Sequence, residues 1–582
     1  MAKRYWIFLI LTSCIAQTAV FPLRDVRAGL HGVGKTVFVG DTAADFQVEI
    51  LGVLDNLGPK QSVILARLSG GSLEKTGVIQ GMSGSPVYIN GKLIGAVALA
   101  FNFSKDAIAG IRPIEEMLRP QTGDREMRLR ATASPLGPEL ALTLPSFVSA
   151  SGGGRLSEIS TPVSFNGFTA QTLDQFAPQL RVLGLEPRQG TSGGGAIPQK
   201  LGPPSALHPG DMISVQLLSG DMSAGADGTV TAIDGNRIYA FGHRFLAMGD
   251  TELPFARASV ITVLSSLSSS FKISTAREWM GTITEDRSTA ISGELGRVAS
   301  AVPVSITVDG ARGRTAYHLR MVNDRTLSPF LLQMAVYSAL DATERTLGAG
   351  SFTLRGKVEF AGGVEPLSLD NSYAGDFNVP LQASLGVAAP VAYALAAGFD
   401  AMKLKSVELN VSASQQRRIL QIDQVTPSRR DVHPGDAVEL TVTLLGANGV
   451  ETVRKIRFQT PIGTPPGPLF FTVADALTTN TGEFQQTIGV PSRSATQLVT
   501  LLNTFRINTK AYVRVWRADT AFQMQGQTLA GPPPSLALIL AKDSSALTSA
   551  QWNRGSTIAE IALDGSPDVV AGSKTVQVEV QE

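Results

Sequence analysis

The sequence predicts a mainly β protein built of barrels and sandwiches. Of its 582 residues, 58 are glycine and 32 are proline. Short runs of Val, Ile, Thr and Leu recur between glycine-containing turns, as in chains of strands joined by tight connections. At roughly 100–200 residues per domain, a chain of this length corresponds to three or four domains.

The charge of the chain is balanced, with 50 basic and 49 acidic residues. No long basic run is present, so the sequence lacks the electrostatic footprint of a nucleic-acid-binding protein. Two triple-glycine clusters, at 152–154 and 193–195, read as loops or linkers, because no Gly-Lys-Ser/Thr follows them. We therefore expect no nucleic-acid partner and no phosphate-binding loop.

The first 25 residues are predicted to be an export signal. Lys3 and Arg4 precede the apolar stretch 6–10, which is too short to span a bilayer and is followed by small residues. We expect an exported protein of the periplasm or cell envelope, or otherwise a secreted one.

Cys14 is the only cysteine of the chain. Residues 11–14 resemble a bacterial lipobox, in which Cys14 would be lipidated and would tether the protein to a membrane. Ordinary cleavage near Ala16 or Ala19 is the alternative. A single cysteine excludes a disulfide within the chain and a cysteine-based metal site. We expect the protein to need no cofactor.

The run Gly81-Met82-Ser83-Gly84-Ser85-Pro86 places a serine between two glycines, directly before the apolar stretch 87–100 with its own turn at Asn90-Gly91. Glycines let the backbone bend so that the N–H groups of Gly81 and Ser83 converge on one point, as an oxyanion hole requires. The alternative is a plain turn between two strands.

A serine nucleophile needs an imidazole to take its proton. Of five histidines, His243 follows the apolar strand 237–241 and a glycine, where a side chain can point into a cleft. The other four are interpreted as turn or strand residues: His208 and His433, which each open a His-Pro-Gly-Asp turn, His318 in an alternating strand, and His31 in a glycine-rich turn.

These motifs resemble the SpoIVB peptidase family. The similarity covers residues 28–120 and 205–300, through the stretches 32–38, 48–53, 76–86, 90–97 and 228–243. It implies a chymotrypsin-like double β-barrel serine endopeptidase with Ser83 as the nucleophile and His243 as the base. The partner it implies is a protein or peptide substrate.

Two features depart from that family. The family has its histidine before its serine, whereas here Ser83 precedes His243, so the two halves are in permuted order. The family's acid lies shortly before the serine, where this chain offers no aspartate between Asp55 and Ser83. The acid is therefore unassigned, with Asp286 and Asp250 as candidates because they follow His243, and a PDZ segment is not evident.

The chain divides into six expected parts. Four helices are expected, near 113–118, near 173–180, after Ser328 as N-cap with Pro329 in the first turn, and after Ser494 as N-cap. The parts are a signal peptide (1–25), a serine-bearing barrel half (26–125), a connector with glycine-rich loops (126–204), a histidine-bearing barrel half with one helix (205–370), an immunoglobulin-like domain (371–475) and a C-terminal α+β domain (476–582).

Two functions from different classes remain open. The first is an exported serine endopeptidase that forms an acyl-enzyme at Ser83. The second is a non-catalytic envelope binding or scaffold protein that keeps the peptidase fold, which the missing aspartate before Ser83 favours. An esterase elbow is excluded, because Gly-x-Ser-x-Gly would need glycine where Ser85 stands and a helix after the turn.

Overall fold

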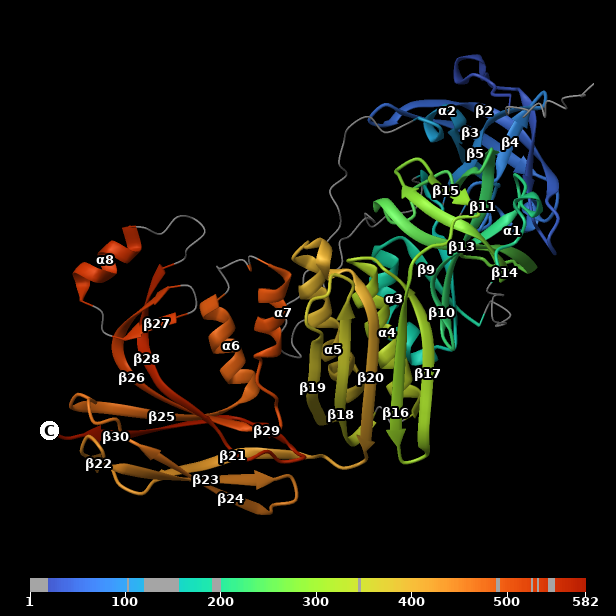
Figure 1. Cartoon of the computed structure of the whole chain (residues 1–582). Helices are drawn as coiled ribbons and strands as arrows, with labels where there is room; N and C mark the ends of the chain where they lie inside the picture. The colour runs from blue at the N-terminus through green and yellow to red at the C-terminus, as the bar shows by residue number, and fades with distance from the viewer. Residues whose placement is uncertain are drawn as a thin grey trace, which may run out of the picture.

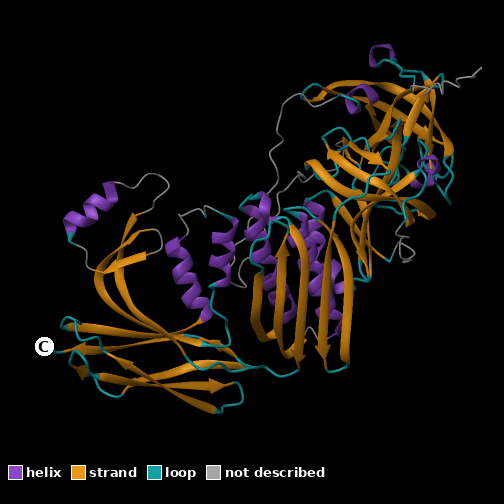
Figure 2. Ribbon diagram, viewed as in Figure 1, coloured by secondary structure: helices purple, strands orange, loops and turns teal. Residues whose placement is uncertain are grey.

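The computed structural model describes residues 19–101, 104–119, 156–190, 200–343, 347–487, 492, 494–524, 527–530, 533–542 and 550–582. Strands make up most of the molecule, and the helices are fewer (Figure 2). The predicted mainly β class is therefore confirmed. Cys14 and both triple-glycine clusters lie outside the described residues.

The serine-bearing part of the chain forms a closed β-barrel. Its strand order is β4-β1-β2-β3-β6-β5-β7, and a further pairing of β4 with β5 closes the first six strands into a ring. The predicted turn at Asn90-Gly91 joins β4 to β5. The elements are η1 (Leu23–Asp25), β1 (His31–Thr36), β2 (Ala44–Gly58), β3 (Gln61–Ser69), α1 (Leu73–Thr76), β4 (Pro86–Ile89), β5 (Lys92–Phe101), β6 (Ile108–Pro113), α2 (Ile114–Met117) and β7 (Leu156–Glu158).

The histidine-bearing part forms a second ring of strands inside a larger sheet. β10 pairs with β11 and with β13, which completes the ring β10-β13-β14-β15-β12-β11. Apolar side chains from all six strands belong to one buried cluster: Val215, Val230, Ile238, Phe255, Met280 and Ile291. The elements are β8 (Thr161–Asn166), α3 (Ala170–Val182), β9 (Leu185–Gln189), η2 (Pro204–Ala206), β10 (Met212–Gly220), β11 (Ser223–Asp234), β12 (Arg237–Ala240), β13 (Gly249–Leu264), β14 (Phe271–Asp286) and β15 (Ile291–Leu295).

Beyond the second barrel the same sheet continues from β10 through β17, β16, β20 and β18 to β19. Helices α3, α4 and α5 lie together behind these strands (Figure 1). β20 pairs in parallel with β16, so the sheet extends to Ser414, past the domain boundary expected at residue 370. The elements are β16 (Ala301–Gly310), β17 (Gly313–Val322), α4 (Leu327–Thr343), β18 (Leu347–Phe360), β19 (Leu367–Phe377), α5 (Val379–Ala396), η3 (Asp400–Met402) and β20 (Leu404–Ser414).

Helix α5 is the one helix among the described residues that is long and apolar enough to cross a membrane. In the folded chain, 67% of this apolar window is buried. The helix packs against α4 and against β18 and β19, and Val387 and Val391 join the main core. These contacts are those of a core helix.

The C-terminal part is one sandwich of two facing sheets. One sheet has the order β24-β23-β21-β29, and the other contains β22, β30, β25, β26, β27 and β28. Both contribute to a single core, so the two domains expected at 371–475 and 476–582 share one interior that begins after Ser414. The elements are β21 (Ile419–Pro427), β22 (Asp431–Val432), β23 (Ala437–Gly446), β24 (Glu451–Gln459), β25 (Gly467–Asp475), α6 (Ala476–Thr487), α7 (Ala495–Asn503), β26 (Ala511–Met524), β27 (Gln527–Ala530), α8 (Pro534–Lys542), β28 (Ala550–Ala562), β29 (Val569–Ala571) and β30 (Ser573–Val580).

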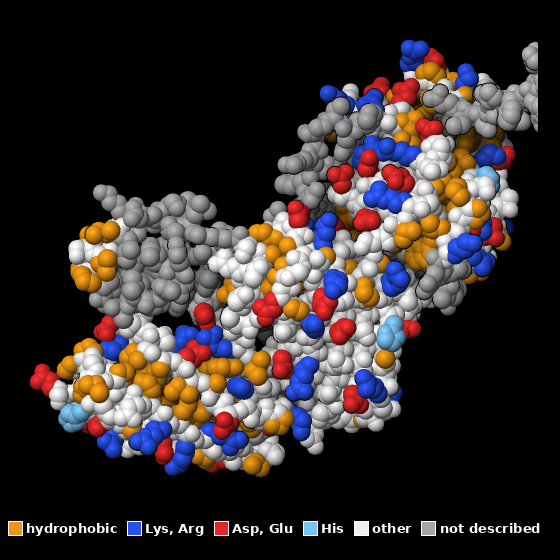
Figure 3. Space-filling model, in the orientation of Figure 1, with side chains coloured by type: hydrophobic (Ala, Val, Ile, Leu, Met, Phe, Trp, Pro, Cys, Tyr) orange, Lys and Arg blue, Asp and Glu red, His pale blue; other side chains and the backbone are white. Residues whose placement is uncertain are grey.

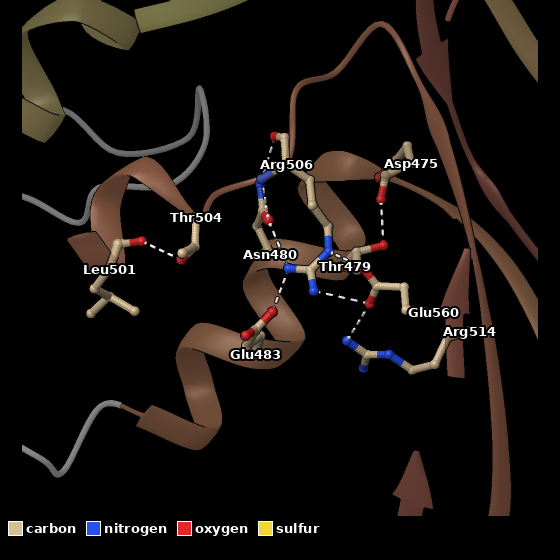
Figure 4. A network of polar contacts seen from close by, with 9 residues as sticks. All are labelled: Asp475, Thr479, Asn480, Glu483, Leu501, Thr504, Arg506, Arg514 and Glu560. Atoms are coloured by element: carbon tan, nitrogen blue, oxygen red, sulfur yellow. Dashed lines mark hydrogen bonds and ion pairs between the residues drawn. The ribbon is translucent and has the colours of Figure 1, made fainter. Parts of the chain in front are cut away.

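A polar network fixes α6 on this sandwich (Figure 4). The Arg506 guanidinium donates to Glu483 on α6 and, at 2.9 Å, to Oε2 of Glu560 on β28. Asn480 on α6 also accepts from the Arg506 backbone at 3.0 Å. Because the two carboxylates share one half-buried guanidinium, the network sets the helix orientation rather than forming a separate reactive site.

Two helix starts test the sequence prediction. Ser494 caps α7 as predicted, with its hydroxyl accepting from the Gln497 backbone N–H at 3.1 Å. The prediction of Ser328 as the cap of α4 is wrong. There Asp324 is the capping residue, since its Oδ1 accepts from the Leu327 backbone N–H at 2.8 Å. A carboxylate at the N-terminus of a helix also interacts favourably with the helix dipole.

The surface carries both signs of charge, with Lys and Arg interspersed among Asp and Glu on the face that Figure 3 shows. Apolar side chains gather on α8 at one end of the molecule, where Leu538 and Ile539 are 70% and 61% exposed.

The two His-Pro-Gly-Asp segments are turns as predicted, since Asp211 and Asp436 each accept from the backbone N–H of the histidine three residues earlier. His31, in contrast, is the first residue of β1.

Candidate functional site

The serine turn of the first barrel is packed directly against β11 of the second. The backbone N–H of Thr229 donates to the Ser83 carbonyl at 2.8 Å. The Thr229 hydroxyl donates to the Gly81 carbonyl at 2.9 Å, and the Thr231 hydroxyl donates to the Gly84 carbonyl at 2.7 Å. Two threonines on one face of a strand therefore hold the turn at three points.

Gly84 explains why the turn needs its second glycine. Its φ is +93°, a conformation that residues with a side chain rarely adopt. A Cβ at this position would lie 2.0 Å from the Thr229 carbonyl oxygen and 2.5 Å from the backbone nitrogen of Phe241. Only glycine allows the serine turn to approach the strand pair that leads to His243.

The backbone amides of the turn are used selectively. Among the described residues, no hydrogen-bond acceptor is found for the N–H groups of Gly81 and Ser83. These are the two amides predicted to form an oxyanion hole. The neighbouring amides all donate within the fold: Gln80 to Ser270, Met82 to Ile79, Gly84 to Val97, and Ser85 to Met82.

Ser83 and His243 are both deeply buried, at 1% and 2% exposure. Within the described part of the chain, neither Ser83 Oγ nor His243 Nε2 has a hydrogen-bond partner. The expected Ser83–His243 hydrogen bond is therefore not formed in this conformation, and the pairing of the two side chains stays a prediction. Buried polar atoms without partners are costly, so two of them on converging segments point to function.

The ring of His243 has a defined orientation. Its Nδ1 lies 2.6 Å from the carbonyl oxygen of Arg244. A carbonyl only accepts, so Nδ1 carries the proton in the neutral ring and Nε2 keeps its lone pair. Burial lowers the pKa of His243, and the nearby carboxylate of Glu158 opposes that shift. The imidazole is thus held neutral in the tautomer that a general base needs.

Asp286, one of the two predicted acids, is fully buried beside the loop that follows His243. Its carboxylate accepts backbone N–H groups from Phe245 at 2.8 Å, Leu246 at 2.7 Å and Met248 at 3.1 Å. It fixes this loop, whereas the Nδ1 contact expected of a triad acid is made by the Arg244 carbonyl. Asp250, the other candidate, is exposed at the start of β13.

Glu158 is a site residue that the sequence reasoning missed. It lies on β7, and its Oε2 accepts from Arg244 Nε at 3.1 Å. The carboxylate therefore fixes the residue whose carbonyl orients His243, and its charge acts on the imidazole. No motif marks this glutamate. It comes from the stretch expected to be a connector, and only its pairing with β5 brings it to the site.

Arg112 connects the two barrels below the histidine loop. It is 3% exposed, its Nη1 donates to Gln61 at 3.1 Å, and it forms an ion pair of 3.6 Å with Glu116. Its Nε donates to the Gly242 carbonyl at 3.4 Å. A cation from the first barrel thus contacts the residue immediately before His243.

The fold and this geometry define a two-barrel β protein whose serine turn is packed against the strand pair that leads to a buried histidine. Comparison with known families gives a match to the first barrel. The model of the SpoIVB peptidase S55 family matches residues 17–118, and the resemblance predicted from the sequence is confirmed for this part, which carries Ser83. The first barrel is thus the part of the chain that is similar to the SpoIVB peptidase S55 family. The match ends before His243, so the permuted order stays a prediction. No curated protein and no solved structure matches the chain significantly.

Proposed function

We propose that this protein is an exported serine endopeptidase of the SpoIVB type with protein or peptide substrates. The observation that carries the proposal is the turn at Ser83. Among the described residues, its buried hydroxyl has no hydrogen-bond partner and the N–H groups of Gly81 and Ser83 have no acceptor, and the turn is packed against the strands that lead to His243. A structural turn between strands gives no reason for this combination.

The proposed reaction is acyl transfer. Ser83 Oγ attacks the peptide carbonyl as His243 Nε2 takes its proton, and the same nitrogen returns the proton to the leaving amine. The N–H groups of Gly81 and Ser83 stabilise the oxyanion. Proton transfer needs Oγ and Nε2 at about 2.6–3.2 Å, a hydrogen bond that often tightens only when substrate binds.

The orienting role is proposed for Arg244 and Glu158. In a triad, a carboxylate holds Nδ1–H and stabilises the imidazolium. Here the Arg244 carbonyl accepts from Nδ1, and Glu158 holds the Arg244 side chain while contributing its negative charge. Asp286 supports the same loop from the other side through the backbone of residues 245–248.

The test is labelling of the purified mature protein with a fluorophosphonate probe. We expect labelling of the wild type and its loss in both Ser83→Ala and His243→Ala. Ser85→Ala is the matched control, because Ser85 is also buried with a hydroxyl that lacks a partner, and this variant should retain labelling. Labelling that persists in Ser83→Ala would exclude Ser83 as the nucleophile.

One observation favours the second candidate function, a non-catalytic envelope scaffold. Ser83 Oγ is inaccessible to solvent, and it forms no hydrogen bond with His243 in this conformation. A folded wild type that stays unlabelled with and without added peptide would support the scaffold over the peptidase.

Export to the periplasm or cell envelope is proposed from the basic and apolar residues of the first 25 positions. Lipidation at Cys14 is the proposed mode of membrane association. Metabolic labelling with a fatty-acid analogue tests it, with Cys14→Ser as the control. A mature protein that carries no lipid would instead point to cleavage near Ala16 or Ala19.

A further inference from the structure

A cavity of about 730 Å³ lies in the second barrel part, between β8, β10, β11, β14 and the segments around them. This volume is in the range of small-ligand sites. Its walls are mostly small or polar. Five buried polar side chains share it, and none is more than 5% exposed: Ser164, Ser214, Gln216, Asp227 and Ser274.

The hydrogen bonds of this group run toward Asp227. Ser274 Oγ donates to Asp227 Oδ2 at 2.7 Å and Ser164 Oγ donates to it at 3.2 Å, while the Ser214 hydroxyl bonds the same carboxylate. Gln216 in turn donates from Nε2 to Ser214 Oγ at 2.8 Å. A hydroxyl has one proton, so a serine that donates to Asp227 can act toward a ligand only as an acceptor.

The polar end of the cavity is thus lined by acceptors around a carboxylate. A ligand group that complements it must be rich in donors and positively charged, as guanidinium and ammonium groups are. The arginines that line the cavity, Arg297 and Arg320, are exposed, and Arg297 pairs with Glu294 at 3.4 Å. They lie toward solvent, whereas Asp227 is 1% exposed at the other end.

The nearest buried cation is Lys272, which does not line the cavity. Its Nζ donates to Thr36 Oγ1 at 2.7 Å, and its stem lies beside Gly81. Burial lowers the pKa of Lys272 to about 7, and burial raises the pKa of Asp227 to about 6. Near neutral pH, Lys272 is therefore only partly protonated and only partly neutralises the ionised Asp227. The remaining negative charge can attract a cationic ligand.

We propose that this cavity binds a guanidinium or alkylammonium group through Asp227. The cavity adjoins the serine turn, because Asp227 and Thr229 share one face of β11, about 7 Å apart along the strand, and Thr229 holds Ser83. A basic side chain of a peptide substrate is one source of such a group, and this source rests on the proposed peptidase function. A free small amine is the other source.

Direct binding tests the cavity without catalysis. The Ser83→Ala protein is titrated with N-acetyl-arginine amide and with N-acetyl-citrulline amide by calorimetry. Citrulline has nearly the same shape as arginine but carries an uncharged urea group. We expect the arginine amide to bind at least tenfold more tightly. Equal affinities, or no binding of the arginine amide to the folded protein, would overturn the proposal.

Matched variants place the binding site. Asp227→Asn should weaken arginine-amide binding at least tenfold, whereas Asp221→Asn, which removes an exposed carboxylate of the same cavity, should leave it within twofold. Gly225→Ala keeps the carboxylate but displaces side chains that line the cavity. The new Cβ would lie 2.3 Å from Gln216 Nε2 and 2.5 Å from Ser214 Oγ. Thermal unfolding confirms that each variant is folded. A folded Asp227→Asn or Gly225→Ala protein that binds as tightly as its parent contradicts the assignment.

Two further arms separate the sources and the two proposals. If the group is a substrate side chain, the wild type cleaves arginine-containing peptides faster than matched citrulline peptides, and Asp227→Asn removes the difference. If the source is a free amine, agmatine binds the Ser83→Ala protein and peptide cleavage shows no such preference. Arginine-amide binding without fluorophosphonate labelling would support the proposed binding site and contradict the proposed peptidase function. Labelling without binding would do the reverse.

Discussion

Nδ1 of His243 lies 2.6 Å from the carbonyl oxygen of its neighbour Arg244. This contact replaces the carboxylate that holds the equivalent nitrogen in a catalytic triad. It fixes the proton on Nδ1 and leaves Nε2 as the acceptor, with no charge placed against the ring by the carbonyl itself. The negative charge that an imidazolium would need comes from Glu158. This carboxylate does not bond to the ring itself but accepts from the side chain of Arg244.

The first prediction concerns the protonation of His243. Burial lowers its pKa below the ordinary value of 6.5, so the imidazole should be neutral throughout the neutral range. NMR titration of the imidazole, assigned by comparison with His243→Gln, should give a midpoint below pH 6.5 and the Nδ1–H tautomer above it. If the protein cleaves peptides, the acidic limb of kcat/KM should fall in the same range. A midpoint above 6.5 would contradict the orientation described here.

The second prediction concerns the docking of the serine turn. Gly84→Ala forces a Cβ to within 2.0 Å of the Thr229 carbonyl oxygen at a φ of +93°. Overpacking and the strained backbone together should cost at least about 3 kcal/mol of unfolding free energy. Chemical denaturation measures the loss, and fluorophosphonate labelling should vanish with it.

Gly91→Ala is the control for that change. Gly91 also has a positive φ, but nothing lies within 4 Å of the position its Cβ would take. Only the backbone strain of about 1–2 kcal/mol should appear. Equal losses in the two variants would show that the contact between the turn and β11 contributes nothing.

The third prediction contrasts two buried serines. Ser83 Oγ has no hydrogen-bond partner among the residues that the structure describes, so Ser83→Ala should leave stability unchanged or raise the free energy of unfolding by about 1–2 kcal/mol. Ser274 donates to the Asp227 carboxylate, so Ser274→Ala should lower it by about 1.5–3 kcal/mol. Denaturation of both variants at one pH tests the contrast. A marked loss in Ser83→Ala would mean that its hydroxyl is stabilising and would weaken the functional interpretation.

The fourth prediction concerns Lys272, whose pKa burial lowers to about 7 from 10.5. Between pH 7 and 10 the unfolded chain binds a proton at this lysine that the folded chain does not, so the free energy of unfolding should rise with pH in that window. Asp227, with its pKa near 6, is already ionised there. The rise should disappear in Lys272→Met.

Denaturation at pH 7, 8 and 9 measures this slope. Lys35→Met serves as the control, because it removes an ammonium group whose side chain is 42% exposed and paired with Asp45. Its slope should match that of the wild type. A slope that survives in Lys272→Met would assign the titration to another group.

The sequence predicted the backbone geometry of the serine turn well because that geometry is local. The positive φ angles of Gly81 and Gly84, the hairpin after Pro86 and the unengaged amides of Gly81 and Ser83 all depend on a few consecutive residues. Glycine tolerates such backbone angles, so its spacing around Ser83 marks the turn in any fold that contains it. The elimination of the turn histidines His208 and His433 rested on the same kind of local signal.

The partners of that turn could not be predicted in the same way. Glu158 reaches His243 only because β7 pairs with β5, and Lys272 reaches Gly81 only because β14 begins beside Gln80. The extent of the central sheet could not be predicted for a related reason: β20 joins it through a parallel pairing with β16, about a hundred residues earlier in the chain. An isolated glutamate, lysine or strand carries no mark of a distant partner.

By itself, then, the sequence determined the β class and the serine turn with its two candidate oxyanion amides, and it offered His243 as the candidate base. Only the tertiary structure decided that Thr229 and Thr231 hold the turn, that Glu158 holds the side chain of Arg244 near the histidine, and that Asp227 faces a cavity. The physical reason is the range of the interactions. Backbone angles and turns are encoded within a few residues, whereas burial, strand pairing and electrostatic contacts arise only when segments far apart in the sequence are brought together.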